Sequence, residues 1–263
     1  MNDLKILICE GNLIDESNKF KKAGIQTHTE SLKDSISCYT NNISIDVLNP
    51  SSELDMNEIV PNLKSYDGLI WGGSSLNIYN DTPEIRRQIL FMKECFKNIK
   101  KILAICWGMQ VAVTASGGEV KKARKGSHIG IAKNIQLTEN GINSLLYKDK
   151  NHEFNSPAFN FDEVVTVPKD AIHLAFNSIN KIQSLNFKTG VSDVTGLQYH
   201  PEITYKKMVD IIKFRKNNLI TKTDAFKDEI ELNKHIDFIE KENEISEPYS
   251  RMLELRNWLN LIS

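Results

Sequence analysis

The sequence predicts an α/β protein with a single, doubly wound and mostly parallel sheet that is flanked by helices. Three short, unbroken apolar runs are each followed closely by glycine, a pattern typical of strands buried on both faces. These runs lie at residues 5–9, 68–71 and 102–106. The stretches between them carry apolar residues at helical spacing. Such strands, alternating with amphipathic helices, indicate a parallel sheet covered on both sides.

Two helices between these strands follow from the spacing of apolar residues. The first is indicated by Leu32, Ile36 and Tyr39, which fall on one helical face. The second begins near Pro83, a residue that suits the first turn of a helix. Its apolar face is formed by residues three or four positions apart, namely Ile85, Ile89, Met92, Cys95 and Phe96.

The middle of the chain predicts a small region of antiparallel strands. Residues 117–132 are expected to form a hairpin. Short, closely spaced apolar runs predict further strands at residues 135–137, 163–167, 172–175 and 182–185. One more core strand is expected at residues 196–199, directly before a His-Pro-Glu sequence.

From residue 204 onward the pattern becomes helical and more charged. No repeat, low-complexity tract or linker divides the chain, so we expect residues 1–203 to form the α/β domain and residues 204–263 a helical extension packed on it. Met208 and Ile211 give the first helix of this extension an apolar face, and Trp258 is a late apolar anchor. A region this charged has too little apolar content for a core of its own.

Composition excludes several classes of protein. Of the 263 residues, 40% are hydrophobic and 25% charged, which is unlike a disordered chain. The net charge of −1 lacks the basic excess of a nucleic-acid-binding protein. The apolar runs are too short to span a membrane and no signal peptide is evident, so a cytoplasmic location is expected. The four scattered cysteines predict neither a disulfide framework nor a structural zinc site.

Cys106 is the first candidate for chemistry, because it ends a buried strand just before a predicted helix. A sharp strand-to-helix turn projects its junction residue above the sheet. The free amides and dipole of the following helix favour a thiolate, the form that attacks a carbonyl carbon. Composition alone leaves a buried structural cysteine as an equal alternative.

Two further segments carry candidate functional residues. His200 and Glu202 follow the expected strand at residues 196–199, and alternate residues of an extended chain share a face. They suit a general base and the carboxylate that orients it, although a plain loop histidine fits a His-x-Glu sequence better. Gly73 follows the strand at residues 68–71, where its amide can receive a developing oxyanion. An ordinary tight turn explains that glycine equally well.

The three segments DGLIWGGSS, LAICWGMQ and LQYHPE, in this order, resemble the class I glutamine amidotransferases, a family with a Cys-His-Glu triad. More narrowly, SSLNIYNDTPEIRRQI, GGEVKKARKGSHIGIA and the helical extension resemble the stand-alone, GMP-synthase-like amidotransferase proteins. The resemblance implies that Cys106 is the nucleophile, that His200 is its base and that Glu202 orients His200.

The resemblance also assigns supporting roles. It implies that the amides of Gly73 and Trp107 form the oxyanion hole, and that Gln110 holds the glutamyl part of the substrate. Two positions depart from the family pattern. Ala104 stands where the family usually has glycine, and Asn160 stands where it commonly has histidine. The second departure lies outside the triad and bears on substrate detail.

No metal ligands or resident cofactor are expected. The remaining histidines lack metal-ligand spacing, and no glycine-rich phosphate loop is present. The basic stretch at residues 121–125 is either a contact for an anionic substrate or partner, or a solvated turn.

The resemblance implies hydrolysis of a γ-glutamyl amide, glutamine to glutamate and ammonia, through a cysteinyl thioester. The ammonia acceptor would belong to a separate, ATP-using synthetase subunit. One alternative is a γ-glutamyl hydrolase acting on a substituted γ-glutamyl amide. Two others are a catalytically idle binding module on the same fold and a cysteine peptidase. The acceptor, the partner and the oligomeric state stay open.

Overall fold

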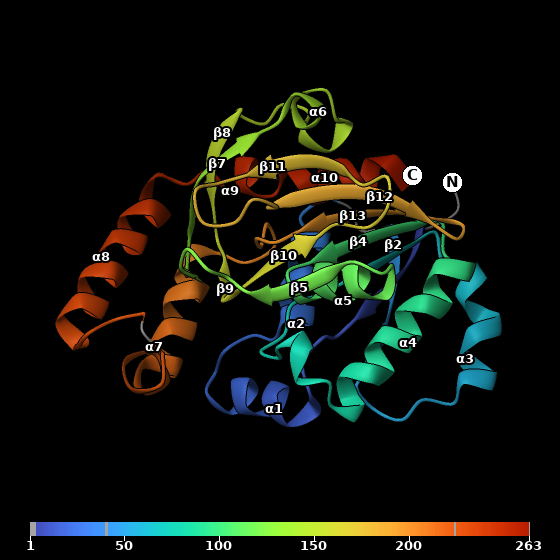
Figure 1. Cartoon of the computed structure of the whole chain (residues 1–263), viewed down its shortest axis with the longest axis horizontal. Helices are drawn as coiled ribbons and strands as arrows, with labels where there is room; N and C mark the ends of the chain where they lie inside the picture. The colour runs from blue at the N-terminus through green and yellow to red at the C-terminus, as the bar shows by residue number, and fades with distance from the viewer. Residues whose placement is uncertain (1–3, 40–41, 224, 263) are drawn as a thin grey trace.

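A nine-stranded sheet forms the centre of the protein, as the computed structural model shows for residues 4–39, 42–223 and 225–262 (Figure 1). The strand order is β2-β1-β3-β4-β13-β12-β11-β7-β8. The first five strands are parallel to their neighbours: β2 (Ile43–Leu48), β1 (Leu4–Cys9), β3 (Gly68–Trp71), β4 (Lys101–Ile105) and β13 (Ser192–Leu197). The other four add antiparallel: β12 (Ser184–Thr189), β11 (Ile172–Phe176), β7 (Ala132–Leu137) and β8 (Glu153–Ser156). The α/β prediction is confirmed.

Helices cover both faces of the sheet. The helices of the α/β part are α1 (Ile14–Lys22), α2 (His28–Ser37), α3 (Met56–Asn62), α4 (Pro83–Asn98), α5 (Trp107–Ala115) and α6 (Glu139–Ile142). The C-terminal helices are α7 (Tyr205–Thr221), α8 (Glu229–Ile245), α9 (Pro248–Arg251) and α10 (Leu253–Ile262). Short 3₁₀ turns lie at Leu63–Ser65, Ile78–Asn80 and Leu145–Tyr147. Within the described residues, no helix is both long and apolar enough to cross a membrane.

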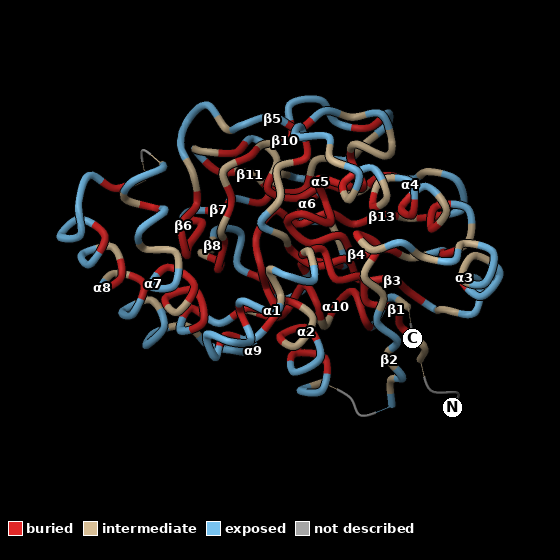
Figure 2. The backbone as a smooth tube through the Cα atoms, turned by 90° about the horizontal axis from the view of Figure 1, so that it is seen from below, coloured by how far each residue is buried: buried red, intermediate tan, exposed pale blue. Residues whose placement is uncertain are grey.

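Alternating residues of the central strands feed two separate cores. In β1, Leu7 lies in the core under α4 and α5, while Ile6 and Ile8 lie in the core under α2 and α10. All three side chains are fully buried. Figure 2 shows this burial running through the central strands and fading toward the outer helices. Burial on both faces explains why these strands read as unbroken apolar runs.

The predicted hairpin at residues 117–132 is wrong. Its two strands do not pair with each other: β5 (Glu119–Lys122) pairs with β10 (Asp162–Thr166), and β6 (His128–Ile129) pairs with β9 (Phe159–Asn160). The reason is that the two strands serve different cores. Val120 is buried with the α4–α5 core, whereas Ile129 is buried with α7 and α8.

The boundaries of three further predicted elements differ from those in the structure. The strand expected at residues 182–185 is β12, which begins at Ser184, and the strand expected at residues 196–199 is β13, which ends at Leu197. Residues 198–202 therefore leave the sheet, which frees the side chain of His200 from the strand. The helix predicted from Leu32, Ile36 and Tyr39 is α2, which ends at Ser37, so Tyr39 lies outside it.

The C-terminal helices pack on the α/β part at three places, one of which is the cluster of α7 and α8 with Ile129. Met208 and Ile211 of α7 lie against Phe20 of α1. On the other side, Trp258 of α10 covers Gly68, where a Cβ would come within 2.6 Å of the indole ring. We propose that residues 204–263 form no independent domain, because α7 and α10 bury apolar side chains against the α/β part and the cluster between α7 and α8 is completed by Ile129 and Ile131.

A buried ion pair fixes α10 to the body. Lys150 Nζ lies 2.9 Å from Glu254 Oε2, and the two side chains are 3% and 0% exposed. Tyr199 donates its hydroxyl proton to the other oxygen of Glu254 at 2.8 Å, and Tyr199 directly precedes His200. The extension is thereby tied to the segment that carries His200.

We expect Lys150→Met to lower the free energy of unfolding by about 3–5 kcal/mol, because it leaves the Glu254 carboxylate buried without its cation. Urea unfolding measures the loss. The double variant Lys150→Met/Glu254→Leu should recover part of it, since no uncompensated charge stays inside. A loss below about 0.5 kcal/mol in the single variant, typical of a surface pair, would contradict this role.

Candidate active site

Cys106 occupies the sharp turn between β4 and α5. Its backbone has φ 53° and ψ −101°, a conformation that residues with a side chain rarely adopt. Its amide donates to Leu197 O of β13 at 2.6 Å. Gly108 lets α5 start this close to β3, because a Cβ there would come within 2.4 Å of Trp71 O. The turn is thus held from both neighbouring strands.

His200 and Glu202 lie next to Cys106, as expected from the sequence. His200 Nδ1 bonds to Glu202 Oε1 at 2.8 Å, and the His200 side chain also bonds to that of Cys106. The bond to Glu202 leaves Nε2 to face the sulfur. Cys106, His200 and Glu202 are 3%, 1% and 2% exposed, respectively.

The charges around His200 favour its protonated form. Burial lowers the pKa of His200, but the Glu202 carboxylate and Cys106 outweigh burial and hold that pKa above its ordinary value. Gln198 Nε2 lies 3.6 Å from Cys106 Sγ, and the amino end of α5 begins beside it. An imidazolium, a hydrogen-bond donor and the amino end of a helix therefore lie around the sulfur.

Gly73 and Trp107 lie next to the residues of the predicted triad. Trp107 is the first residue of α5, so its amide has no partner within the helix. Gly73 follows β3 by two residues and packs against two imidazole rings: a Cβ there would come within 2.8 Å of both His200 Cε1 and His28 Cε1. Only glycine fits this position. The geometry therefore suits the predicted oxyanion hole.

His28, which the sequence did not single out, stacks on His200 with ring centroids 5.2 Å apart and planes 22° from parallel. It is the first residue of α2, whose start is fixed by a capping box between Thr27 and Glu30. Burial, together with the positive charges of His200, Lys207 and Arg215, holds the pKa of His28 well below its ordinary value. A neutral ring is therefore stacked beside the charged one.

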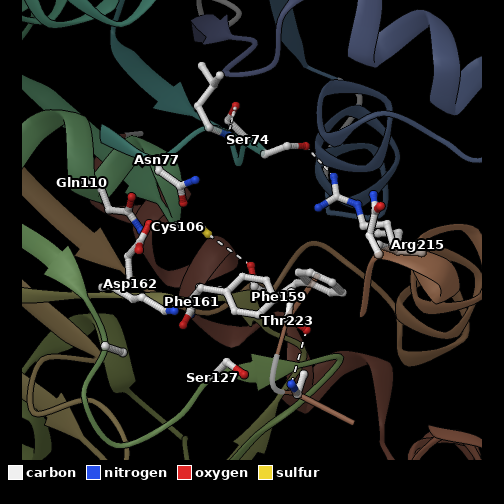
Figure 3. Close-up of a pocket in the computed structure, with 18 of the residues that line it drawn as sticks. Ser74, Asn77, Cys106, Gln110, Ser127, Phe159, Phe161, Asp162, Arg215 and Thr223 are labelled. Atoms are coloured by element: carbon white, nitrogen blue, oxygen red, sulfur yellow. Dashed lines mark hydrogen bonds between the residues drawn. The ribbon is translucent and has the colours of Figure 1, made fainter. Parts of the chain in front are cut away.

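Cys106, His200 and His28 line a cavity of about 760 Å³ (Figure 3). Gln110 lines it and is almost fully buried, and its Oε1 has no hydrogen-bond partner within the described residues. Asp162 and Arg215, which the sequence did not point to, also line the cavity. Asp162 comes from β10 and Arg215 from α7, and in Figure 3 they lie on opposite sides of Cys106.

Asp162 carries the cavity's buried carboxylate. It accepts a hydrogen bond from Tyr79 Oη at 3.1 Å. Burial raises the pKa of Asp162 to about 6, against the lowering effects of Tyr79 and Lys122. This carboxylate is ionised at neutral pH and protonated in mild acid.

The two departures from the family pattern fit their surroundings. Ala104 pairs with Gly196 of β13, which presents no side chain toward it. Asn160 bonds through Oδ1 to His128 Nδ1 at 3.1 Å, and its Nδ2 donates to Gln198 O at 3.3 Å. Since Gln198 touches the sulfur, Asn160 steadies the donor to Cys106.

Across the described ranges, His28, His200 and Glu202 are the group whose ligand-type atoms lie close enough to hold a metal, all within 4.8 Å. His200 and Glu202 already bond to each other. Glu202 also faces the positive charges of Lys207 and Arg251. We therefore interpret this group as part of the triad geometry and not as a metal centre.

The family model for glutamine amidotransferase class-I matches residues 24–216, which include every residue of the candidate site. The chain belongs to this family. A Pseudomonas protein named gamma-glutamyl-L-1-hydroxyisopropylamide hydrolase is 32% identical over 207 residues, which span 78% of this chain and 69% of that protein. These family members are hydrolytic enzymes that cleave carbon–nitrogen bonds.

Other relatives show the range of the family. Gamma-glutamyl peptidase 4 of Arabidopsis thaliana is 30% identical over 57% of this chain and 59% of that protein. The glutamine-hydrolysing GMP synthase subunit of Methanosarcina acetivorans is 29% identical over 60% of this chain and 80% of that protein. A glutamine amidotransferase structure from Thermotoga maritima has a TM-score of 0.67 at 17% identity, covering 100% of this chain and 99% of that one. This last likeness shows a shared fold.

We expect Glu202→Gln to move the pH midpoint of Cys106 alkylation upward by about 1–3 pH units. Without the carboxylate the pKa of His200 falls, so the imidazolium that stabilises the thiolate is lost as pH rises toward neutrality. Iodoacetamide kinetics on a Cys38→Ser background measure this, because Cys38 is the exposed cysteine. Burial raises the pKa of Cys9 and Cys95, which keeps both as unreactive thiols. An unchanged midpoint would remove Glu202 from this role.

Proposed function

We propose that the protein hydrolyses substituted γ-glutamyl amides through a thioester on Cys106. The observation that carries this proposal is the strained Cys106 turn beside the His200–Glu202 pair, at the wall of a cavity of about 760 Å³. A cavity in the upper part of the range of about 300–1,000 Å³ usual for small-molecule sites leaves room for a leaving group larger than ammonia. The similarity to the Pseudomonas hydrolase supports the same function.

In the first half-reaction, the Cys106 thiolate attacks the γ-carbonyl carbon of the substrate. The oxygen becomes an oxyanion, and the amides of Gly73 and Trp107 donate to it. His200 then gives its proton to the leaving nitrogen as the carbon–nitrogen bond breaks. The products of this half-reaction are a free amine and a γ-glutamyl thioester on the enzyme.

In the second half-reaction, a water molecule replaces the amine. His200 takes one proton from the water as its oxygen attacks the thioester carbonyl, and the same two amides receive the second oxyanion. Collapse releases glutamate and returns the sulfur as a thiolate beside the imidazolium. Glu202 holds His200 in one orientation through both halves.

The γ-glutamyl group needs a partner for its α-ammonium, and Asp162 meets this need. It is the carboxylate that lines the cavity among the described residues, on the same side of Cys106 as Gln110 in Figure 3. A charge-assisted hydrogen bond between a carboxylate and an ammonium is stronger than a neutral one. The amide oxygen of Gln110 has no hydrogen-bond partner within the described residues, so it can accept a further hydrogen bond from the α-ammonium.

A second candidate function is a glutaminase that delivers ammonia to a separate, ATP-using synthetase subunit. The similarity to the Methanosarcina GMP synthase subunit favours it. Both candidates use the same chemistry on Cys106 and differ in the leaving group. Steady-state kinetics of the purified protein separate them. A hydrolase turns over a substituted γ-glutamyl amide well without a partner, whereas a glutaminase of this kind prefers glutamine and is activated by its synthetase.

We expect Cys106→Ala to lower kcat for a γ-glutamyl amide by at least about 10⁴-fold, because the nucleophile is lost. Thermal unfolding should change little, since the deleted sulfur faces the cavity. Cys38→Ala and Cys95→Ala are the matched controls, and both should keep their turnover. Retained activity in Cys106→Ala together with lost activity in Cys95→Ala would show that the nucleophile is assigned to the wrong cysteine.

We expect Asp162→Asn to raise KM by about 10- to 100-fold, because a charge-assisted contact with the α-ammonium becomes a neutral one. In the wild type, KM should rise as pH falls below about 6, where the Asp162 carboxylate takes up its proton and loses its attraction for the ammonium. The Asn variant should lack this acid-side rise. Initial rates between pH 5 and 8 measure both effects, and a variant that keeps the rise would place the titrating group elsewhere.

A further inference from the structure

The side chains that line the catalytic cavity are unevenly charged. Within the described residues they include two lysines and two arginines, Lys122, Arg124, Arg215 and Lys222, in addition to His200, against one carboxylate, Asp162. Lys122 and Arg124 belong to β5 and the segment after it, within the basic stretch at residues 121–125. Lys222 follows α7. Lys122 lies opposite Asp162 in the β5–β10 pair, and its charge acts on that carboxylate. Arg124 and Lys222 make no side-chain salt bridge within the described residues.

Arg215 is held in place by its surroundings more firmly than these three. Its guanidinium lies 5.6 Å from the ring centroid of Phe20 and 5.2 Å from that of Phe159. Its Nη2 bonds to Glu16 Oε1 at 3.2 Å and to Ser75 Oγ. No hydrogen bond is recorded for Nε or Nη1 among the described residues. The guanidinium is therefore oriented on one edge and has donors left on the other.

The placement of the two charges divides the cavity into two halves. Asp162 and Gln110 lie on one side of Cys106, and Arg215 lies on the other (Figure 3). The scissile carbonyl carbon must sit at the sulfur, and the glutamyl chain and the leaving amine extend from it in different directions. If the α-ammonium lies at Asp162, the leaving amine extends toward Arg215.

We propose that the preferred leaving group is an amine that carries a carboxylate, so that the substrates are γ-glutamyl amino acids or short γ-glutamyl peptides. Arg215 is the specificity-determining residue that pairs with this carboxylate through its unused donors. Lys122, Arg124 and Lys222 attract the anionic substrate from a distance. This inference rests on the proposed hydrolase function and narrows its substrate class. It also makes the C-terminal extension part of the binding site.

The test compares two substrates of the same shape, γ-glutamyl-alanine and γ-glutamyl-alaninamide, which differ in the charge of the leaving group. The wild type should favour the acid by about 10- to 100-fold in kcat/KM, the usual effect of one charge-assisted contact. Added salt should reduce this preference, because it screens the charges of Lys122, Arg124 and Lys222. In Arg215→Met the ratio of the two kcat/KM values should fall to near 1.

Two control variants distinguish recognition of the leaving-group carboxylate by Arg215 from a structural role of this residue. Glu16→Gln removes the ion-pair partner of Arg215 but keeps the guanidinium, so it should keep the preference for the acid. Arg124 lies on an exposed segment, so Arg124→Gln tests the long-range attraction of the anionic substrate without altering the buried core. This variant should lower the association rate of γ-glutamyl-alanine in a salt-dependent manner and leave that of γ-glutamyl-alaninamide unchanged.

The outcomes are distinct. Equal turnover of the acid and the amide by the wild type would overturn this inference and leave the hydrolase function standing. An equal loss for both substrates in Arg215→Met, matched by Glu16→Gln, would show that Arg215 is structural and would also overturn it. Absence of turnover with both substrates, and with glutamine, would overturn the hydrolase function and this inference with it.

Discussion

The backbone turn at Cys106 is the constraint on which the rest of the site depends. Its φ of 53° and ψ of −101° are unfavourable for a residue with a side chain, so the surrounding structure must hold the turn in place. The contacts to Leu197 and Trp71 do this from β13 and β3, the two strands that flank β4. Those same two strands lead into the segments that carry His200 and Gly73. Cys106, His200 and Gly73, the proposed nucleophile, base and oxyanion donor, therefore meet at the same edge of the sheet.

The C-terminal helices contribute to the site as well as to its stability. Lys207 of α7 donates to Thr27 O at the start of α2, next to His28. Arg251 of α9 donates to the carbonyls of Pro201 and Ile203, on either side of Glu202. Arg215 reaches the cavity itself. The extension thus supports the segment that carries His200, the proposed base, and also lines the cavity.

Local patterns predicted the fold class, and short motifs pointed to Cys106, His200 and Glu202, which the structure places next to one another. The central strands are buried on both faces and read as apolar runs, and the motifs around Cys106 and His200 sit directly after them. Contacts between segments that are far apart in the sequence cannot be predicted from such local patterns. His28 lies 172 residues before His200, and only packing reveals their stack. For the same reason, the separate pairing of β5 and β6 and the inward reach of Arg215 were not predicted.

The central claim is that a γ-glutamyl group is carried on Cys106 during turnover. Intact-protein mass spectrometry after a rapid acid quench, with a panel of γ-glutamyl amides, tests it most directly. We expect one adduct with the mass of a γ-glutamyl acyl group, identical for every substrate in the panel that reacts. Peptide mapping should place it on Cys106, and hydroxylamine should remove it, as expected of a thioester. Efficient turnover without any adduct on the wild-type protein, or an adduct on another residue, would contradict this claim.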